Sequence, residues 1–152
     1  MGNGIKEPIS IRNAIESDLH AVISLDNLGS KDEKPAYWAG VFQYYFNSHK
    51  NERHFLIAES NGLAVGFIIA EVRAWEFGSP PCGWVFALAV SPIAREVGIG
   101  QRMFQEISLR LKQVGVTNVR TMVDRDNKLL LCFFRGMGLS TGKYLELERA
   151  ID

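Results

Sequence analysis

The sequence has no net charge, no paired cysteine motif and no long apolar run, and each absence removes a class of protein. Seventeen basic residues balance seventeen acidic ones in 152 residues. This argues against a nonspecific nucleic-acid binder, which needs a net basic face to displace counterions. The cysteines are Cys82 and Cys132, with no CxxC pair and no histidine at metal-ligand spacing. We predict two buried thiols in a reducing compartment and no metal site.

The chain also lacks targeting and membrane signals. Residues 1–8 are polar and contain glycine, unlike a signal peptide, and no apolar run approaches the ~20 residues needed to span a bilayer. We therefore expect a cytoplasmic protein that does not bind membranes. The length fits one ordinary domain, so we predict a single domain over residues 1–152 with its core at about 9–149.

Hydrophobic patterning predicts ten elements. We expect strands at residues 9–12, 54–59, 63–72, 83–90, 116–123 and 144–149. Four helices lie between them: one after the N-caps Ser17 and Asp18, one from Pro35, one over 100–114 and one over 127–135. Asn61-Gly62 is a strong hairpin signal. The order predicts an α/β (α+β) fold with a mixed, mostly antiparallel central sheet flanked by helices.

The segment from Ser91 to Gly100 joins an apolar strand to an amphipathic helix and has two glycines near the helix start. Gly98 and Gly100 let the backbone approach a ligand closely, and the first N–H groups of a helix lack internal partners and carry the positive end of its dipole. The turn is therefore a candidate phosphate site. A tight turn that binds nothing is the alternative. A third glycine near Met103 and a Gly-Lys-Ser/Thr step are absent, which excludes the dinucleotide fingerprint and the Walker A loop.

Val90-Ser91-Pro92 followed by Arg95-x-x-Gly98-x-Gly100 resembles the acetyl-CoA signature of the GNAT N-acetyltransferases. The similarity runs from about Ile9 to Glu148 and includes Asn127 before an apolar helix. The resemblance implies the GNAT-like acyl-CoA N-acyltransferase fold. It also implies direct transfer of an acetyl group from acetyl-CoA, without a metal, to a primary amine of a small molecule, a peptide N-terminus or a protein lysine.

The resemblance also implies roles for individual residues. Leu88, Ala89 and Val90 would pair with pantetheine amides, and the Leu88 N–H would also stabilise the developing oxyanion. Asn127 would bind the pantetheine arm, with a helix cap as the alternative. The pyrophosphate would be held by the backbone N–H groups of the turn: Arg95, Glu96, Val97, Gly98, Ile99, Gly100 and Gln101.

Proton transfer is less well defined. An amine with a pKa near ~10.4 must lose a proton before it attacks the thioester, and Glu71 or Glu76 could accept it through a water. A solvated strand-end carboxylate is the alternative for each. Phe134 stands beside the cofactor where the family often has the tyrosine that protonates the leaving thiolate. Tyr144, or a tyrosine of the second helix, could replace it.

Several other features leave alternatives open. Trp75 and Phe77 lie in a Gly- and Pro-containing loop and are candidates for the wall of the acceptor pocket. Phe134 and the acid-free strand 83–90 favour an acyl-CoA sensor with little turnover as the second hypothesis. A structural domain that binds no ligand is the third. A homodimer is possible.

Overall fold

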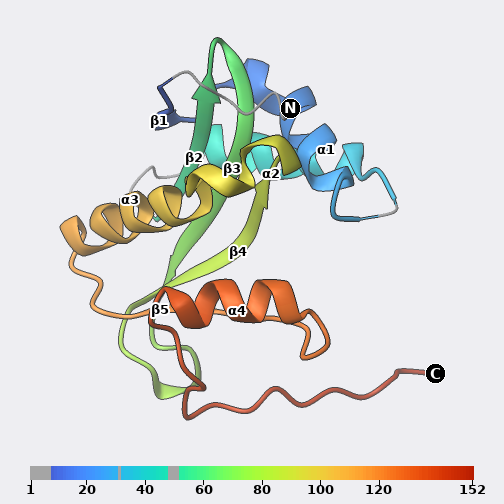
Figure 1. Ribbon diagram of the computed structural model, residues 1–152. Coiled ribbons are helices and arrows are strands. Elements are labelled where there is room, and N and C mark those ends of the chain that lie inside the picture. The colour runs from blue at the N-terminus through green and yellow to red at the C-terminus, as the bar shows by residue number, and fades with distance from the viewer. Residues whose placement is uncertain (1–7, 31, 48–51) are drawn as a thin grey trace. The chain divides into compact units, whose positions relative to one another are not determined.

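The computed structural model describes residues 8–30, 32–47 and 52–152, and the chain divides into two compact units, residues 1–122 and 123–152. The first unit contains a five-stranded sheet in the order β1-β2-β3-β4-β5 (Figure 1). Its strands are β1 Ser10–Asn13, β2 Arg53–Ser60, β3 Leu63–Arg73, β4 Cys82–Val90 and β5 Val119–Thr121. The first four strands pair antiparallel, and β5 pairs parallel to β4. The mixed, mostly antiparallel sheet is confirmed.

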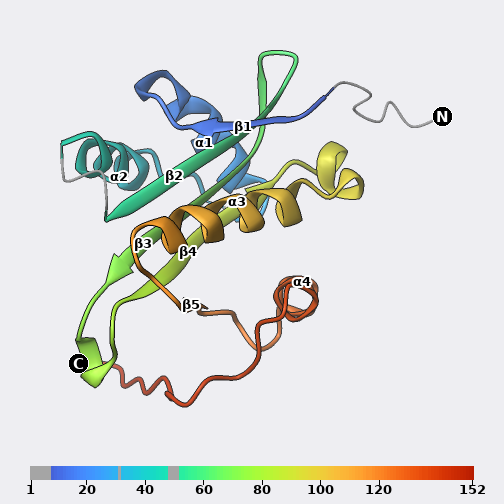
Figure 2. The ribbon, with the colours of Figure 1, turned by 90° about the vertical axis from the view of Figure 1, so that its left-hand side faces the viewer.

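Helices cover both faces of this sheet (Figure 2). Helices α1 (Leu19–Asn27) and α2 (Pro35–Asn47) pack on one face, and α3 (Ile99–Gln113) packs on the other. Three short 3-10 helices complete the unit: η1 Glu16–Asp18, η2 Glu76–Gly78 and η3 Pro92–Val97. The second unit contains α4 (Lys128–Gly136), followed by chain without helix or strand to residue 152.

Strand β3 is buried on both faces, as its unbroken apolar sequence predicts. Phe67 and Ile69 belong to the core cluster that includes Val22 of α1 and Trp38 of α2. The alternate residues face α3, where a Cβ added to Gly66 would lie 3.0 Å from Met103 Cε. The sheet is thus the middle layer of the first unit.

Glycine allows α3 to approach the sheet closely. A Cβ at Gly83 of β4 would lie only 2.5 Å from Leu111 Cδ1, so a larger residue there would force the Leu111 side chain to shift. The hairpin between β2 and β3 is also confirmed. Asn61 and Gly62 both have positive φ, 52° and 74°, which is the type I′ arrangement expected for Asn-Gly.

Four expectations from the sequence are wrong. Residues 144–149 form no strand: Leu145 and Leu147 are 85% and 89% exposed, because alternation specifies a face but supplies no partner strand. The predicted strand 116–123 is paired only over Val119–Thr121. Val114, which the apolar period of the predicted helix 100–114 placed on the buried face, is exposed just after α3, and Cys132 is exposed on α4, although Cys82 is buried as expected.

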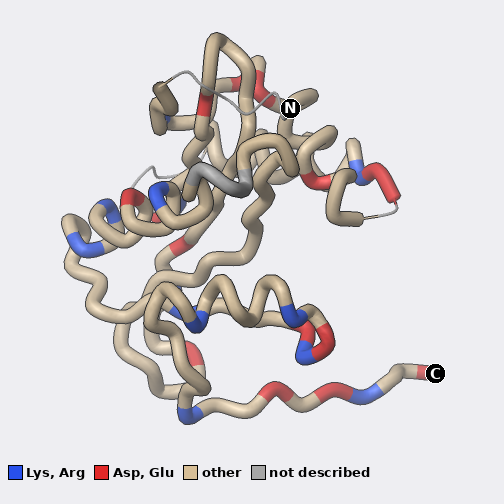
Figure 3. The backbone as a smooth tube through the Cα atoms, in the orientation of Figure 1, with Lys and Arg blue, Asp and Glu red and all other residues tan. Residues whose placement is uncertain are grey.

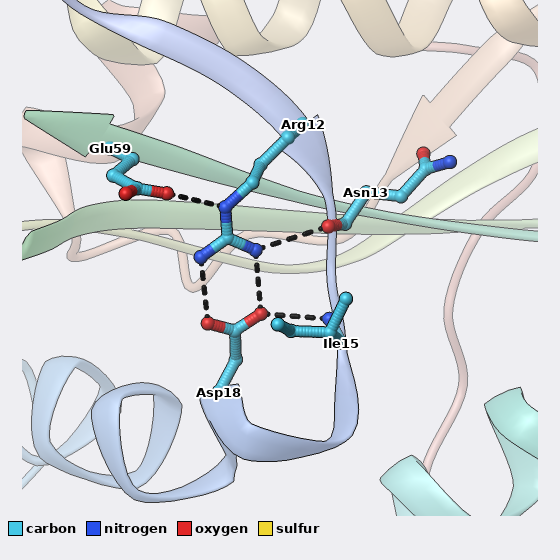
Figure 4. A network of polar contacts seen from close by, with 5 residues as sticks. All are labelled: Arg12, Asn13, Ile15, Asp18 and Glu59. Carbon is cyan, nitrogen blue, oxygen red and sulfur yellow. Dashed lines mark hydrogen bonds and ion pairs between the residues drawn. The ribbon is translucent and has the colours of Figure 1, made fainter. Parts of the chain in front are cut away.

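Arg12 ties β1 to the turn before α1 (Figure 4). Its Nη1 and Nη2 lie 2.8 and 2.9 Å from the two carboxylate oxygens of Asp18, and its Nε donates to Glu59 of β2. Asp18 also accepts a hydrogen bond from the Ile15 N–H, and it makes no capping bond to α1. Burial raises the pKa of Asp18, but the bonds from Arg12 and Ile15 and the charge of Arg12 outweigh burial and hold the pKa below 3.8.

Replacing Asp18 with Asn should lower the free energy of unfolding by ~2 kcal/mol at neutral pH, because it removes a charged partner from Arg12. The folded-state pKa is depressed, so the carboxylate stabilises the fold above its unfolded pKa, and this contribution is lost as the pH falls through the folded value. The loss should therefore shrink at acid pH.

Urea denaturation at about pH 7 and about pH 3 measures this effect. Exposed Glu16→Gln, in the same turn, is the matched control and should change stability little. An Asp18→Asn loss of the same size at both pH values would contradict the assignment.

Candidate active site

The turn that follows β4 leads into the N-terminus of α3. Ser91 donates to the Val65 carbonyl at 2.8 Å, which fixes the end of β4 against β3. After η3, Gly98 adopts φ 72° and ψ 26°, and α3 begins at Ile99. The bond from Arg102 N to Gly98 O, at 3.1 Å, is the first of the helix. The N–H groups of Ile99, Gly100 and Gln101 precede it, so they have no acceptor in the helix.

Gly98 is required here for its conformation and for the space around it. Its positive φ is unfavourable for residues with a Cβ, and a Cβ built on it would meet no atom within 4 Å. The turn is therefore open beside Gly98. The dipole of a 15-residue helix adds positive potential at this end.

Strand β4 keeps a free edge close to this turn. Strand β5 pairs with β4 only at Gly83, Trp84 and Val85, and Thr121 Oγ1 donates to the Val85 carbonyl at 2.8 Å where the pairing ends. Strand β4 then runs on beside β3 to Val90. Because an antiparallel strand directs its backbone groups alternately to its two sides, the stretch Phe86–Ala89 turns some of them toward the side that β5 has left.

A bulge interrupts β4 where β5 departs. Ile69 pairs with Ala87 while Ala70 pairs with Val85, which leaves Phe86 as the extra residue. Bulges bend a strand and redirect its side chains, and they are frequent beside active sites. Phe86 is 37% exposed, although it is an apolar residue in an apolar strand.

Charged side chains gather on the α1/α2 face of the sheet near this bulge. The register aligns Arg53, Glu71, Trp84 and Arg120 as direct neighbours across β2, β3, β4 and β5. Arg73, two residues beyond Glu71, and Glu76 of η2 extend this arrangement. We call these residues the arginine–glutamate row: Arg53, Glu71, Arg73, Glu76, Trp84 and Arg120.

The two glutamates differ in how they are held. Glu71 Oε2 accepts from Arg53 at 2.9 Å, and its Oε1 lies 3.3 Å from Arg73 Nε. Glu76 has a longer contact, 3.5 Å to the same nitrogen, and its side chain is half exposed. Arg73 therefore links the two residues that the sequence suggested as bases, and Glu76 is the less constrained of them.

Aromatic rings border the row. The Arg53 guanidinium lies 4.0 Å from the centre of the Tyr44 ring and 5.2 Å from that of Phe86. Trp75 and Phe77 are 70% and 86% exposed and both have positive φ. Their place in an acceptor pocket stays a prediction.

The remaining predicted site residues lie in the second unit. Asn127 Oδ1 accepts from Leu130 N at 3.1 Å, so Asn127 caps α4. Phe134 is the buried residue of α4 and packs edge to face on Phe133, and Lys143 Nζ lies over the ring of Tyr144. Their roles in cofactor binding and catalysis stay predictions.

The sequence reasoning missed the three arginines of the row. Figure 3 shows basic and acidic residues spread along the whole chain, and Arg53, Arg73 and Arg120 are far apart in the sequence. Only the strand register brings them together. Aligning the two strands of the β2/β3 hairpin in the sequence could have placed Arg53 opposite Glu71. That pair is the one signal of the row that the sequence contains.

The described residues form neither a metal-binding cluster nor a membrane-spanning helix. No cluster of three metal-binding side chains occurs among residues 8–30, 32–47 and 52–152. In the same described ranges no helix is both long enough and apolar enough to cross a bilayer.

A helix N-terminus opened by glycine, beside two strands that part, is a candidate anion-binding site in an α/β domain. The sequence model described as "Acetyltransferase (GNAT) family" matches residues 19–139, and the chain belongs to this family.

Individual relatives support the same placement. The chain is 32% identical over 97 residues to an L-2,4-diaminobutyric acid acetyltransferase of Nocardia farcinica (strain IFM 10152), a match that covers 64% of this chain and 49% of the relative. The chain thus spans about half the length of this curated relative.

Solved structures show the same fold at low identity. Aminoglycoside N-acetyltransferase AAC(6')-Iy in complex with CoA has a TM-score of 0.83 at 16% identity, over 95% of both chains. AAC(6')-Ih from Acinetobacter baumannii has a TM-score of 0.80 at 20% identity, over 95% of this chain and all of that one. The GNAT acyl-CoA N-acyltransferase fold is confirmed.

Glutamate substitutions in the turn should abolish binding of coenzyme A. Gly98→Glu and Gly100→Glu each place a side chain and a negative charge among the free N–H groups. Gly98→Glu should also cost ~1–2 kcal/mol of stability, because of its positive φ. Titration calorimetry with coenzyme A measures the affinity.

Gly115→Glu is a matched control at the other end of α3. Gly115 also has positive φ, 89°, and open space around its Cβ position. This variant should lose similar stability and keep its affinity. If both turn variants bind coenzyme A with unchanged affinity, the turn is not the anion-binding site.

Proposed function

We propose that the protein is an N-acetyltransferase that transfers the acetyl group of acetyl-CoA to a primary amine by direct attack. The observation that carries this proposal is that two sets of backbone N–H groups without a partner in the helix or in β5 follow each other along the chain. One set lies at the start of α3, opened by Gly98, and the other lies along the edge of β4 beyond Val85. Membership of the GNAT family supports it.

The residues present fit an acyl-CoA. The backbone of the turn, from Arg95 to Gln101, would hold the pyrophosphate, since Gly98 leaves the space that phosphate oxygens need. Leu88, Ala89 and Val90 would hold the pantetheine arm through backbone groups at the edge of β4. When bound, acetyl-CoA supplies the acetyl group as an activated thioester.

The Leu88 N–H would stabilise the negative charge that develops on the thioester oxygen. Leu88 pairs with Ile68 and lies just past the bulge at Phe86, so its backbone is held in place by the sheet. A fixed donor needs no reorganisation as the charge develops, which is the source of its catalytic effect.

Glu76 is the better candidate to receive the proton of the acceptor amine. Both oxygens of Glu71 already contact guanidinium groups, so this carboxylate positions Arg53 and Arg73. Glu76 has one long contact and is half exposed, so it can bind the ammonium group and pass the proton to solvent through a water. A carboxylate in this role typically contributes ~10²-fold or more to the rate.

The thiolate of coenzyme A can leave without a strong general acid. With a pKa near ~8.5 it can depart without full protonation, so Phe134 is compatible with turnover. Tyr144 is the proposed source of a proton where one is needed. The cytoplasmic location, the single domain over residues 1–152 and the homodimer expected from the sequence also remain proposals.

Glu76→Gln should lower kcat by about 100-fold or more and leave the affinity for acetyl-CoA nearly unchanged, because the residue acts on the amine. Glu71→Gln should instead lower the melting temperature, since it leaves Arg53, with 17% of its side chain exposed, without a carboxylate. Release of free thiol from acetyl-CoA with an amine panel, together with thermal melts, separates the two effects.

The same assay tests the second candidate function. Acetyl-CoA that raises the melting temperature while no amine releases thiol would identify an acyl-CoA sensor. If acetyl-CoA causes neither a thermal shift nor thiol release, the protein is a structural domain that binds no ligand. A Glu76→Gln variant as active as the parent would remove Glu76 from the mechanism.

A further inference from the structure

We infer that the acceptor carries a carboxylate as well as its reactive amine, as a diamino acid does, and that Arg73 binds this carboxylate. This inference rests on the proposed function and narrows its substrate class. It is carried by the arginine–glutamate row, whose members come from β2, β3, η2, β4 and β5.

Arg73 has donors to spare. Its Nε approaches Glu71 and Glu76 at 3.3 and 3.5 Å, whereas its two terminal nitrogens donate no hydrogen bond among the described residues. Its guanidinium carbon lies 5.5 Å from the centre of the Trp84 ring. A planar guanidinium resting on an aromatic ring is partly pre-organised, and its paired N–H groups match a carboxylate.

The other two arginines of the row are already engaged. Arg53 donates to Glu71 and lies against the rings of Tyr44 and Phe86, with 17% of its side chain exposed. Arg120 Nη1 donates to Ser79 Oγ at 2.8 Å. Arg73 is 43% exposed, so it is the arginine of the row that an acceptor can reach.

The charge of the row also favours an anionic group. Three arginines face two glutamates, which leaves one positive charge in excess (3 − 2 = 1). A polycation such as an aminoglycoside would meet net repulsion at short range, although Glu76 can hold a single ammonium group. A zwitterionic acceptor satisfies both signs, with its carboxylate on Arg73 and an amine at Glu76.

The row lies close to the site proposed for the reaction. Trp84 is in the row and Phe86, the bulged residue, is two positions along β4, a separation of roughly 7 Å at the usual strand rise. A diamino acid whose carboxylate lies on Arg73 would place its reactive amine beside Glu76, which contacts the same arginine at 3.5 Å. The relative named for L-2,4-diaminobutyric acid is consistent with this class.

The test compares two acceptors that differ only in the carboxylate. Diaminobutyrate without its carboxyl group is 1,3-diaminopropane, and kcat/KM for each is measured by thiol release with the full chain. We expect at least about a tenfold preference for diaminobutyrate, the usual worth of a charged hydrogen-bonded pair. Arg73→Gln should lower kcat/KM for diaminobutyrate at least about tenfold more than kcat/KM for the diamine. Comparing the two losses cancels differences in intrinsic amine reactivity.

Two further variants control for charge and folding. Lys112→Gln removes one positive charge from an exposed position on α3, across the sheet from the row, and should keep the preference. Arg73→Lys should show a preference for diaminobutyrate between those of Arg73→Gln and the parent. The lysine keeps the positive charge, but its single ammonium group cannot bind both carboxylate oxygens in parallel. Melting temperatures establish that each variant is folded.

The outcomes separate this inference from the proposed function. Thiol release from no amine at all would sink the proposed function and the inference together. Equal or faster turnover of the diamine or of an aminoglycoside would overturn the inference and leave the acetyltransferase assignment standing. An Arg73→Gln variant that loses equally on both acceptors would show that Arg73 merely holds Glu71 and Glu76 in place.

Discussion

The early departure of β5 from β4 is the constraint on which the candidate site depends. A central strand normally uses both edges for pairing, but β4 pairs with β5 at only three residues, and the Thr121 hydroxyl closes the last position on the Val85 carbonyl. Backbone groups beyond that point need other partners. They lie on the stretch of β4 that leads to the start of α3, where further N–H groups are unpaired. The close fit of α3 over Gly66 and Gly83 holds the helix so that its N-terminus follows β4.

Strand register determines the acceptor side in the same way. One alignment of the four strands places Arg53, Glu71, Trp84 and Arg120 in a line, and the bulge at Phe86 turns an aromatic side chain toward that line. A slip of one residue in any strand would move its contribution to the α3 face and into the core. For β2 and β3 the two-residue turn at Asn61-Gly62 opposes such a slip, because turn type and loop length fix the register of a hairpin. The strand register therefore fixes the positions of these charges.

Features encoded by local sequence could be predicted. Asn61-Gly62 specified the hairpin, the apolar run of β3 specified its central place, and the spacing of Gly98 and Gly100 specified the turn. Features that depend on distant partners could not. The alternation of Leu145 and Leu147 suggested a strand, yet pairing requires a neighbour that the pattern does not name. Cys132 was expected in the core because cysteine usually is, and it lies on an exposed side of α4. Arg73 and Arg120 carried no local signal, and Arg53 carried one only through its place opposite Glu71 in the hairpin, because the register brings the three together.

The two sides of the site are built from different kinds of groups, and this bears on what the relatives can teach. The proposed donor side consists of backbone N–H groups, which many sequences can supply once the strand, the glycine and the helix are in place. That explains how AAC(6')-Iy shares the fold at 16% identity. The acceptor side consists of side chains, so it can change while the fold stays constant. A shared fold therefore says little about the acceptor, whereas the excess of arginine over glutamate near Phe86 bears on it directly. The whole chain is electrically balanced, and that average conceals the local excess of charge that would select the acceptor.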